Sequence, residues 1–133
     1  MHPLYAKAAR LTETVIGGAI EVQREMGPGL IESVYEWCLI RELELRNLEV
    51  VSQHSVTIRY KGLTRVEPLR CDLLVEDCLL IEIKALEGIL PIHKAQLLSY
   101  MKLLDVPIGL LINFHEPRLT TGISRLILRG AGP

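Results

Sequence analysis

The chain has 133 residues, of which 49% are apolar and 23% charged, and its net charge is −1. This length predicts one domain over residues 1–133, and this composition excludes an intrinsically disordered chain. The charge balance gives no bulk basic signal for nucleic acid, and the high apolar share leaves room for a buried homo-oligomer interface.

The cysteine content and the first residues bear on the cellular compartment. The chain has 3 cysteines and no CxxC pair, which indicates free thiols in a reducing compartment. Residues 1–7 lack the basic and apolar regions of a signal peptide. No apolar run approaches the roughly 20 residues of a membrane span. We therefore expect a cytoplasmic protein without a membrane segment.

Two helices are predicted in the first third of the chain. Apolar residues three and four apart predict a helix over residues 4–26, and similar spacing predicts another over 30–46. Gly27-Pro28-Gly29 separates them, and Asn47 suits the end of the second. Gly17-Gly18 interrupts the first helix, which indicates either close approach of another backbone or a kink.

Strands are predicted where the apolar period changes to two. One strand is expected over residues 49–60, followed by a turn at Lys61-Gly62 and a return strand over 63–67. Residues 71–85 then form two apolar strands joined by a short acidic turn. This second hairpin is the centre of the predicted sheet.

A third helix and two more strands complete the predicted fold. The helix covers residues 91–105, an almost wholly apolar strand covers 108–114, and an edge strand covers 123–129. The helix is expected to form a right-handed crossover that makes strands 79–84 and 108–114 parallel. The class is α/β or α+β with a mixed central sheet flanked by helices, two of them N-terminal.

Three charged residues lie among the apolar residues of the 71–85 hairpin, namely Asp72, Glu82 and Lys84. Burying an unpaired charge costs several kcal/mol, so these residues require an explanation. Because strand side chains alternate between faces, Glu82 and Lys84 share one face of the sheet.

The length of the turn decides whether Asp72 shares that face. A two-residue loop, Glu76-Asp77, would pair Asp72 with Ile81 and place the two acids on opposite faces. A three-residue loop over 76–78 would place Asp72 directly opposite Glu82. A functional pair of acids predicts the longer loop or a bulge. The alternative, in which each carboxylate finds an arginine or solvent, predicts the shorter turn.

Opposed carboxylates and a nearby lysine suit phosphodiester chemistry with a divalent cation. Oxygen ligands favour Mg²⁺ or Mn²⁺, and the backbone carbonyl of Ile83 could add a third protein oxygen. Lys84 would position the attacking water and offset charge on the phosphorus. Arg70 shares a face with Asp72 and could pair with it or contact a phosphate.

These residues resemble a known nuclease signature. Asp72 followed by Glu82-Ile83-Lys84 resembles the PD-(D/E)XK nuclease motif, with Cys71 in the place of the proline. Gly29-Leu30-Ile31-Glu32-Ser33-Val34-Tyr35 resembles the motif of the GxxExxY protein family. Gln96-Leu97-Leu98-Ser99-Tyr100 resembles the QxxxY helix of RecB-like members of the nuclease superfamily.

The resemblance extends from about residue 11 to residue 114, with the three motifs in the expected order. It implies a restriction-endonuclease-like α/β fold and a site that binds a divalent metal. The residues that it assigns to this site are Asp72 and Glu82 for the metal, Lys84 for the nucleophile, Glu32 for a metal-side or water-mediated contact, and Gln96 and Tyr100 on the following helix.

Several neighbouring residues are expected to have structural roles instead. Tyr35 is expected to pack in the core with its hydroxyl bonded, and Gly29 to serve backbone geometry. His93 and His115 are expected on the surface. Glu36 falls off the apolar face of its helix.

Three functions remain open at this point. The first is a Mg²⁺-dependent nuclease, with DNA expected before RNA as its partner. The second is a catalytically silent nuclease-fold module for binding or oligomerisation, which the low net charge, the small size and the lack of an evident DNA-binding appendage favour. The third is a nucleotide or small-molecule phosphohydrolase. The complete Asp-Glu-Lys set favours the first, since a scaffold gains nothing from keeping three charges among apolar strands.

Overall fold

The computed structural model describes residues 1–69 and 72–133. The predicted contacts of Arg70, the free thiol of Cys71 and the predicted start of the central hairpin lie outside these residues. The elements in chain order are α1 (Tyr5–Met26), α2 (Glu32–Leu45), β1 (Val50–Ser52), β2 (Ser55–Tyr60), β3 (Leu63–Pro68), β4 (Asp72–Val75), β5 (Leu79–Lys84), α3 (Pro91–Leu104), β6 (Ile108–Asn113), the 3₁₀ helix η1 (Leu119–Gly122) and β7 (Ile123–Ile127).

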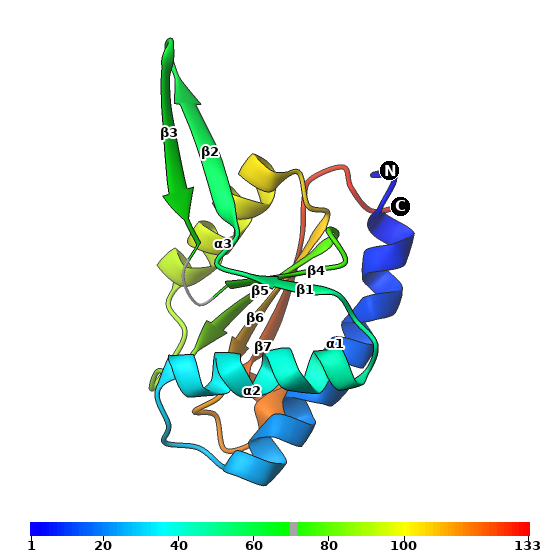
Figure 1. Cartoon of the computed structure of the whole chain (residues 1–133), viewed down its shortest axis with the longest axis vertical. Coiled ribbons are helices and arrows are strands. Elements are labelled where there is room, and N and C mark those ends of the chain that lie inside the picture. Colours follow the sequence, from blue (N-terminus) through cyan, green and yellow to red (C-terminus); the bar gives the residue numbers. More distant parts are fainter. Residues whose placement is uncertain (70–71) are drawn as a thin grey trace.

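A five-stranded mixed sheet in the order β1-β4-β5-β6-β7 forms the centre of the molecule (Figure 1). β5 and β6 are parallel, as the predicted crossover through α3 requires, and the other neighbouring strands are antiparallel. α1 and α2 contact the sheet from one side, and α3 packs with the ribbon of β2 and β3 on the other. The predicted mixed sheet flanked by helices is confirmed.

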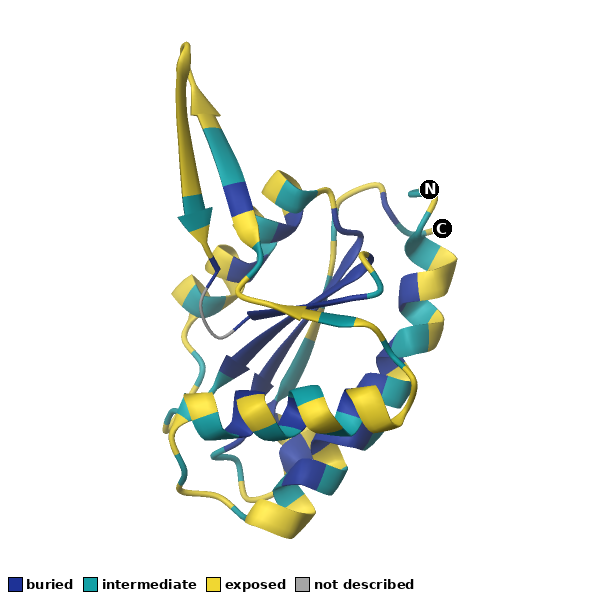
Figure 2. Ribbon diagram, in the orientation of Figure 1, coloured by how far each residue is buried: buried dark blue, intermediate teal, exposed yellow. Residues whose placement is uncertain are grey.

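Both faces of the sheet are buried, which explains why its central strands are almost continuously apolar (Figure 2). Along β5, Leu79, Ile81 and Ile83 face the core formed with α1 and α2. Leu80 faces the smaller core, in which it packs with Leu97 of α3. Because side chains alternate, Glu82 and Lys84 continue the Leu80 row toward α3.

The two N-terminal helices end where predicted. Gly27 and Gly29 have φ values of +73° and +99°, which glycine adopts without strain, and Asn47 has φ of +64° beyond the end of α2. α1 runs through Gly17 and Gly18 as one helix. A Cβ on Gly18 would lie 3.2 Å from the Leu43 side chain, so the glycine accommodates a close approach of α2 side chains rather than of a backbone.

The prediction of one strand over residues 49–60 is wrong. Gln53 has φ of +53°, which turns the chain between β1 and β2. β1 then pairs with β4 in the main sheet, while β2 pairs only with β3 as a separate two-stranded sheet. The period of two is the same in both pieces, so the apolar pattern could not reveal the change of partner.

β2 and β3 form a ribbon that extends away from the rest of the molecule (Figure 1). Its turn is at Lys61-Gly62, as predicted, with φ values of +46° and +87°. The last strand, β7, is at an edge of the main sheet as predicted, although it ends at Ile127 and is preceded by an unpredicted 3₁₀ helix.

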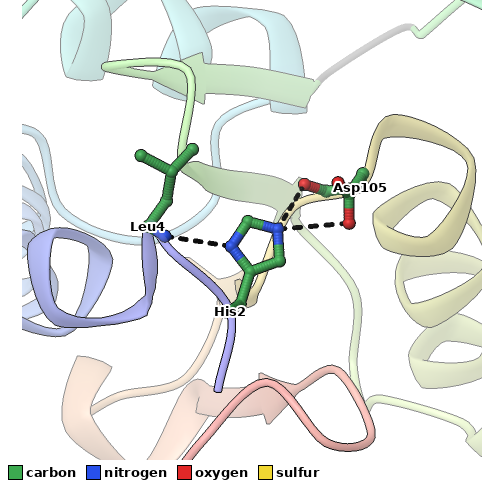
Figure 3. Close-up of polar contacts among 3 residues, drawn as sticks. All are labelled: His2, Leu4 and Asp105. Carbon is green, nitrogen blue, oxygen red and sulfur yellow. Dashed lines mark hydrogen bonds and ion pairs between the residues drawn. The ribbon is translucent and has the colours of Figure 1, made fainter.

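The first residues are held against the body by His2 (Figure 3). Its Nδ1 accepts a hydrogen bond from the Leu4 N–H at 3.0 Å, so its Nε2 is the donor to the backbone oxygen and Oδ1 of Asp105, each at 3.1 Å. The N–H of His2 also donates to the carbonyl of Ala131. Within the two described ranges, no helix is long and apolar enough to cross a membrane.

Candidate functional site

Asp72 and Glu82 lie opposite each other on one face of the β4–β5 hairpin. The register pairs Val75 with Leu79, which leaves three residues between the strands, as the functional pair of acids predicted. Glu76 and Asp77 have φ values of +50° and +57°, and the turn closes with a hydrogen bond from Cys78 N–H to the Val75 carbonyl. The extra residue places both acids on the face toward α3.

The two carboxyl groups are buried and incompletely bonded. Asp72 is 3% exposed and Glu82 6% exposed, and Asp72 Oδ1 and Glu82 Oε2 have no hydrogen-bond partner among residues 1–69 and 72–133. Burial raises the pKa of Asp72 to about 8, and the Glu82 charge adds to the rise. Burial also raises the pKa of Glu82, although the Lys84 charge acts against this. The two oxygens therefore lack a partner that would favour their charged forms.

Lys84 supplies part of that missing charge. Its Nζ lies 3.4 Å from Glu82 Oε1, and its side chain is 18% exposed, so the ammonium is held between solvent and the acids. The Lys84 charge lowers the pKa of Asp72 as well as that of Glu82. The Lys84 charge does not outweigh the effect of burial on either pKa. A further cation beside the pair would therefore stabilise the charged carboxylates.

The acids open into a cavity of about 260 Å³ between the sheet, α3 and the base of the ribbon. The lining residues are Pro68, Leu69, Asp72, Glu82, Gln96 and Tyr100. The spacing of four residues puts Gln96 and Tyr100 on the same side of α3, as the QxxxY resemblance implied. The structure thus brings both metal-side acids and both residues of the helical motif to one cavity.

Glu32 approaches the same strand from α2. Its Oε1 lies 3.4 Å from the Ala85 N–H, directly after Lys84, and its charge raises the pKa of both Asp72 and Glu82. It lines a separate cavity of about 500 Å³ together with residues 29–31, Ser33, Ala85 and His115. Glu32 is therefore electrostatically coupled to the acids and lies outside their cavity.

Tyr35 fixes the loop from which Glu32 extends. Its hydroxyl donates to the Gly27 carbonyl at 2.6 Å and accepts from the Leu30 N–H at 3.2 Å, while its ring stacks on Phe114 at 4.5 Å. The expected core role of Tyr35 is confirmed. Together with the positive φ of Gly29, these bonds fix the path of the chain between the end of α1 and Glu32.

Asn113 is a positioning residue that sequence reasoning missed. It is fully buried on β6 in register with Lys84, and its side-chain amide bonds both the N–H and the C=O of Leu86, at 3.1 and 2.9 Å. These bonds hold the chain immediately after Lys84. A polar residue at the end of an otherwise apolar strand was the available signal.

His115 is not a surface residue, contrary to expectation. Its side chain is half-buried, its Nε2 lies 3.0 Å from the Leu30 carbonyl, and its ring meets the Tyr35 ring edge-on. The helical and strand patterns end before this residue, so no periodicity pointed to it. It joins the Glu32 loop to the end of β6.

Two further titratable residues lie near the acids. Glu36 is buried at 9% exposure, burial raises its pKa, and its charge raises the pKa of Asp72. Its position one turn after Glu32 was the signal that could have identified it. His93 is half-buried, accepts the Leu90 N–H at Nδ1, and lowers the pKa of Glu82 when charged.

The donor set fits a hard divalent cation. Asp72 and Glu82 line one cavity and each have a carboxylate oxygen without a partner among the described residues, and carboxylates are the ligands that Mg²⁺ and Mn²⁺ prefer. In residues 1–69 and 72–133, no three His, Cys, Asp or Glu side chains gather as metal ligands, so further ligands would be backbone or water oxygens. The Ile83 side chain points to the opposite face, and the role of its carbonyl stays a prediction.

Comparison with known proteins gives one match. The family model described as the PD-(D/E)XK nuclease superfamily matches residues 9–126, which is most of the chain. No curated protein and no solved structure matches. The matched range contains every candidate site residue named above.

Proposed function

The chain belongs to the PD-(D/E)XK nuclease superfamily, and from this premise we propose that it hydrolyses phosphodiester bonds of nucleic acid in a reaction that depends on Mg²⁺ or Mn²⁺. The observation that carries the proposal is a pair of buried acids, Asp72 and Glu82, which lie opposite each other, line one cavity and each keep one carboxylate oxygen without a hydrogen-bond partner among the described residues. A protein retains so costly an arrangement when a ligand compensates it.

The residues take distinct roles in this proposal. Asp72, Glu82 and the Ile83 carbonyl hold the cation, which would neutralise the acids, polarise the phosphate and lower the pKa of bound water. Lys84 orients the attacking water and offsets negative charge on the phosphate. Its ion pair with Glu82 fixes the ammonium beside the acids, so we assign it to positioning before proton removal.

The helical residues act around this centre. Gln96 and Tyr100 line the cavity from α3, where their polar groups can bond a phosphate oxygen or the attacking water. Glu32 acts from α2 through a water-mediated contact, which its bond to the Ala85 N–H supports. Its charge would further favour a cation at the two acids.

We also propose the finer assignments that go with this function. The hydroxyl bonds of Tyr35 and the positive φ of Gly29 support membership of the GxxExxY family. We propose one nuclease-like domain over residues 1–133, acting on DNA in preference to RNA. A homo-oligomer in the cytoplasm is consistent with the apolar composition and the free thiols of Cys38 and Cys78.

A catalytically silent module for binding or oligomerisation is the competing proposal. Two observations favour it: the net charge of −1, and only two carboxylates at the cavity in the part of the chain that the structure describes. Such a module would keep the fold and bind a partner without hydrolysing it.

A cleavage assay separates these proposals. Single- and double-stranded DNA and RNA are incubated with Mg²⁺ or Mn²⁺, with wild type and with the Glu82→Ala and Lys84→Ala variants. We expect cleavage by wild type and a loss of at least 100-fold in each variant. Glu44→Ala and Lys102→Ala, which remove exposed charges of the same kinds, should cleave as wild type does.

Two results would count against the nuclease. Cleavage that survives both Glu82→Ala and Lys84→Ala would remove this site from the reaction. Absence of Mn²⁺ binding by calorimetry in wild type would support the silent module. Turnover of nucleotides without turnover of polymers would instead assign a phosphohydrolase.

A further inference from the structure

The ribbon of β2 and β3 (residues 55–68) is much longer than its packing requires. At its base, Val56 is buried and Ile58 half-buried against the core that includes Leu97 of α3. At its tip, Tyr60 and Leu63 are 65% and 72% exposed, and the ribbon projects clear of the body (Figures 1 and 2). An isolated two-stranded ribbon is marginally stable, so its extension points to a partner.

The ribbon is basic although the chain is not. It carries three basic residues, Arg59, Lys61 and Arg65, and one acid, Glu67, which leaves 12 basic and 15 acidic residues in the rest of the chain. Arg65 pairs with Glu67, and Lys61 Nζ lies 5.3 Å from the Tyr60 ring centre. Arg59 makes no ion pair within the described residues. Positive charge is thus concentrated on the most exposed part of the molecule.

The cations that the ribbon can offer to a partner lie on one face and at the turn. Arg59 is opposite Thr64 on one face, and Arg65 is opposite Ile58 on the other. Lys61 lies at the turn between the strands. Arg65 shares its face with its ion-pair partner Glu67 and with the half-buried Ile58. Arg59 and Lys61 are therefore the cations with which the ribbon can contact a phosphate backbone.

The ribbon is continuous with the candidate site. Pro68 ends β3 and lines the cavity of Asp72 and Glu82 together with Leu69. The Leu69 N–H donates to the His54 carbonyl at 3.0 Å, which joins the two ends of the ribbon at its base. A polymer bound along the ribbon therefore passes beside the buried acids.

We propose that the ribbon is an arm that enters the major groove of B-form DNA and holds the duplex beside the cavity of Asp72 and Glu82. Six paired residues span about 20 Å, and the major groove, about 12 Å wide, admits a two-stranded β-ribbon. The deep, narrow major groove of A-form RNA does not. The inference rests on the proposed function for its class of polymer and sharpens it to duplex DNA.

The test measures binding without cleavage. Fluorescence anisotropy follows a labelled DNA duplex of about 20 base pairs in EDTA, between about 50 and 200 mM salt. The Arg59→Ala/Lys61→Ala variant is compared with Lys7→Ala/Arg10→Ala, which removes two exposed charges from α1, away from the ribbon. The ribbon variant should bind the duplex at least about 10-fold more weakly than wild type, and the slope of its log affinity against log salt concentration should be smaller by about 2. The control should bind within about 2-fold of wild type.

Several outcomes would overturn the arm. One is an equal loss of DNA affinity in the two double variants, and another is an equally large loss of affinity for an RNA duplex. A third is the absence of duplex binding by wild type. A fourth is dissociation of a dimer by the ribbon substitutions with DNA affinity unchanged. The last outcome would assign the ribbon to a second copy of this chain. Circular dichroism of each variant verifies that the fold is retained.

Cleavage of the same duplex with Mn²⁺ separates this inference from the proposed function. A duplex that is bound through the ribbon and not cleaved supports the arm and contradicts the nuclease. Metal-dependent cleavage that is lost in Glu82→Ala but equal in the ribbon variant and its control supports the nuclease and contradicts the arm.

Discussion

Asp72 lies directly opposite Glu82 across the β4–β5 pair, and one carboxylate oxygen of each is buried without a hydrogen-bond partner in the part of the chain that the structure describes. Opposed like charges destabilise a strand pair, and burial adds the cost of desolvation. The relationship makes the stability of the protein depend on pH and on divalent cations, and both dependences can be measured.

The first prediction concerns pH. Burial raises the pKa of Asp72 in the folded state to about 8 from its usual value of 3.8, so the folded state binds this proton more tightly than the unfolded state does. The resulting stability is fully present below about pH 4 and is lost as the pH rises toward 8. Asp72→Asn should therefore raise the free energy of unfolding at pH 8, without metal, by about 1–3 kcal/mol.

Urea denaturation at pH 5 and pH 8 measures this effect. The gain in Asp72→Asn should shrink at pH 5, where the wild-type side chain is protonated. Glu44→Gln, which changes an exposed carboxylate, should stay within about 0.5 kcal/mol of wild type at both pH values. A variant that is less stable than wild type at pH 8 would contradict the assigned cost of this buried acid.

The second prediction concerns metal. Mn²⁺ at about 100 times its dissociation constant should raise the free energy of unfolding of wild type at pH 8 by about 2.7 kcal/mol, because the folded state alone presents the paired acids. Glu82→Gln should show no such gain. Thermal denaturation with and without Mn²⁺ measures it, and an equal gain in both proteins would place the cation elsewhere.

The third prediction concerns the turn that sets the register. Asp77 is exposed and has φ of +57°, a conformation that glycine adopts at lower cost. Asp77→Gly should stabilise the protein by about 0.5 kcal/mol, whereas Asp77→Val should destabilise it by more than about 1 kcal/mol. Urea midpoints report both changes. Glu44→Gly and Glu44→Val are the control pair in a helix. If Gly is also the more stable of the two there, the effect at Asp77 is not specific to the turn.

The fourth prediction concerns the loop that carries Glu32. Tyr35→Phe keeps the ring stack on Phe114 and removes the hydroxyl bonds to Gly27 and Leu30. It should cost about 1–2 kcal/mol of stability and reduce metal-dependent cleavage several-fold under folding conditions. Tyr60→Phe, at an exposed tyrosine, is the control for stability. Unchanged stability in Tyr35→Phe would mean that the hydroxyl does not hold the loop.

The fifth prediction concerns Asn113. Asn113→Ala removes the side-chain bonds to Leu86 and leaves part-buried backbone groups of that residue without these partners. We expect a loss of about 2–3 kcal/mol and faster amide hydrogen exchange at Leu86. Gln96→Ala, which removes an exposed amide, should leave both quantities near wild type. Unchanged exchange at Leu86 would contradict the positioning role.

The local features of this protein follow from sequence spacing. The three- and four-residue apolar spacing of α1 and α2 requires one buried stripe on each helix, and Gly29 and Asn47 suit the left-handed conformations at the ends of the linking turns. Asp72, Glu82 and Lys84 stood out because charge among apolar strand residues is costly wherever the strand is buried. These inferences depend only on neighbours within a few residues.

The turn of the central hairpin lies at the boundary of what sequence can determine. Counting residues showed that a loop over 76–78 places Asp72 on the same face of the sheet as Glu82. A loop over 76–77 places it on the other face. The choice between them came from the register, because a shift of β4 by one residue would turn Asp72 into the apolar core beside α1 and α2, where Leu73 and Val75 pack.

Tertiary structure alone decided which partner each segment meets. Residues 49–60 have one period of two, yet β1 joins the main sheet and β2 forms the ribbon, because pairing depends on distant strands rather than on the period. Glu36 is buried because α2 turns that side toward the sheet, and Asn113 reaches Leu86 because β6 lies beside β5. Sequence spacing determined which side chains share a face, and long-range packing determined what each face meets.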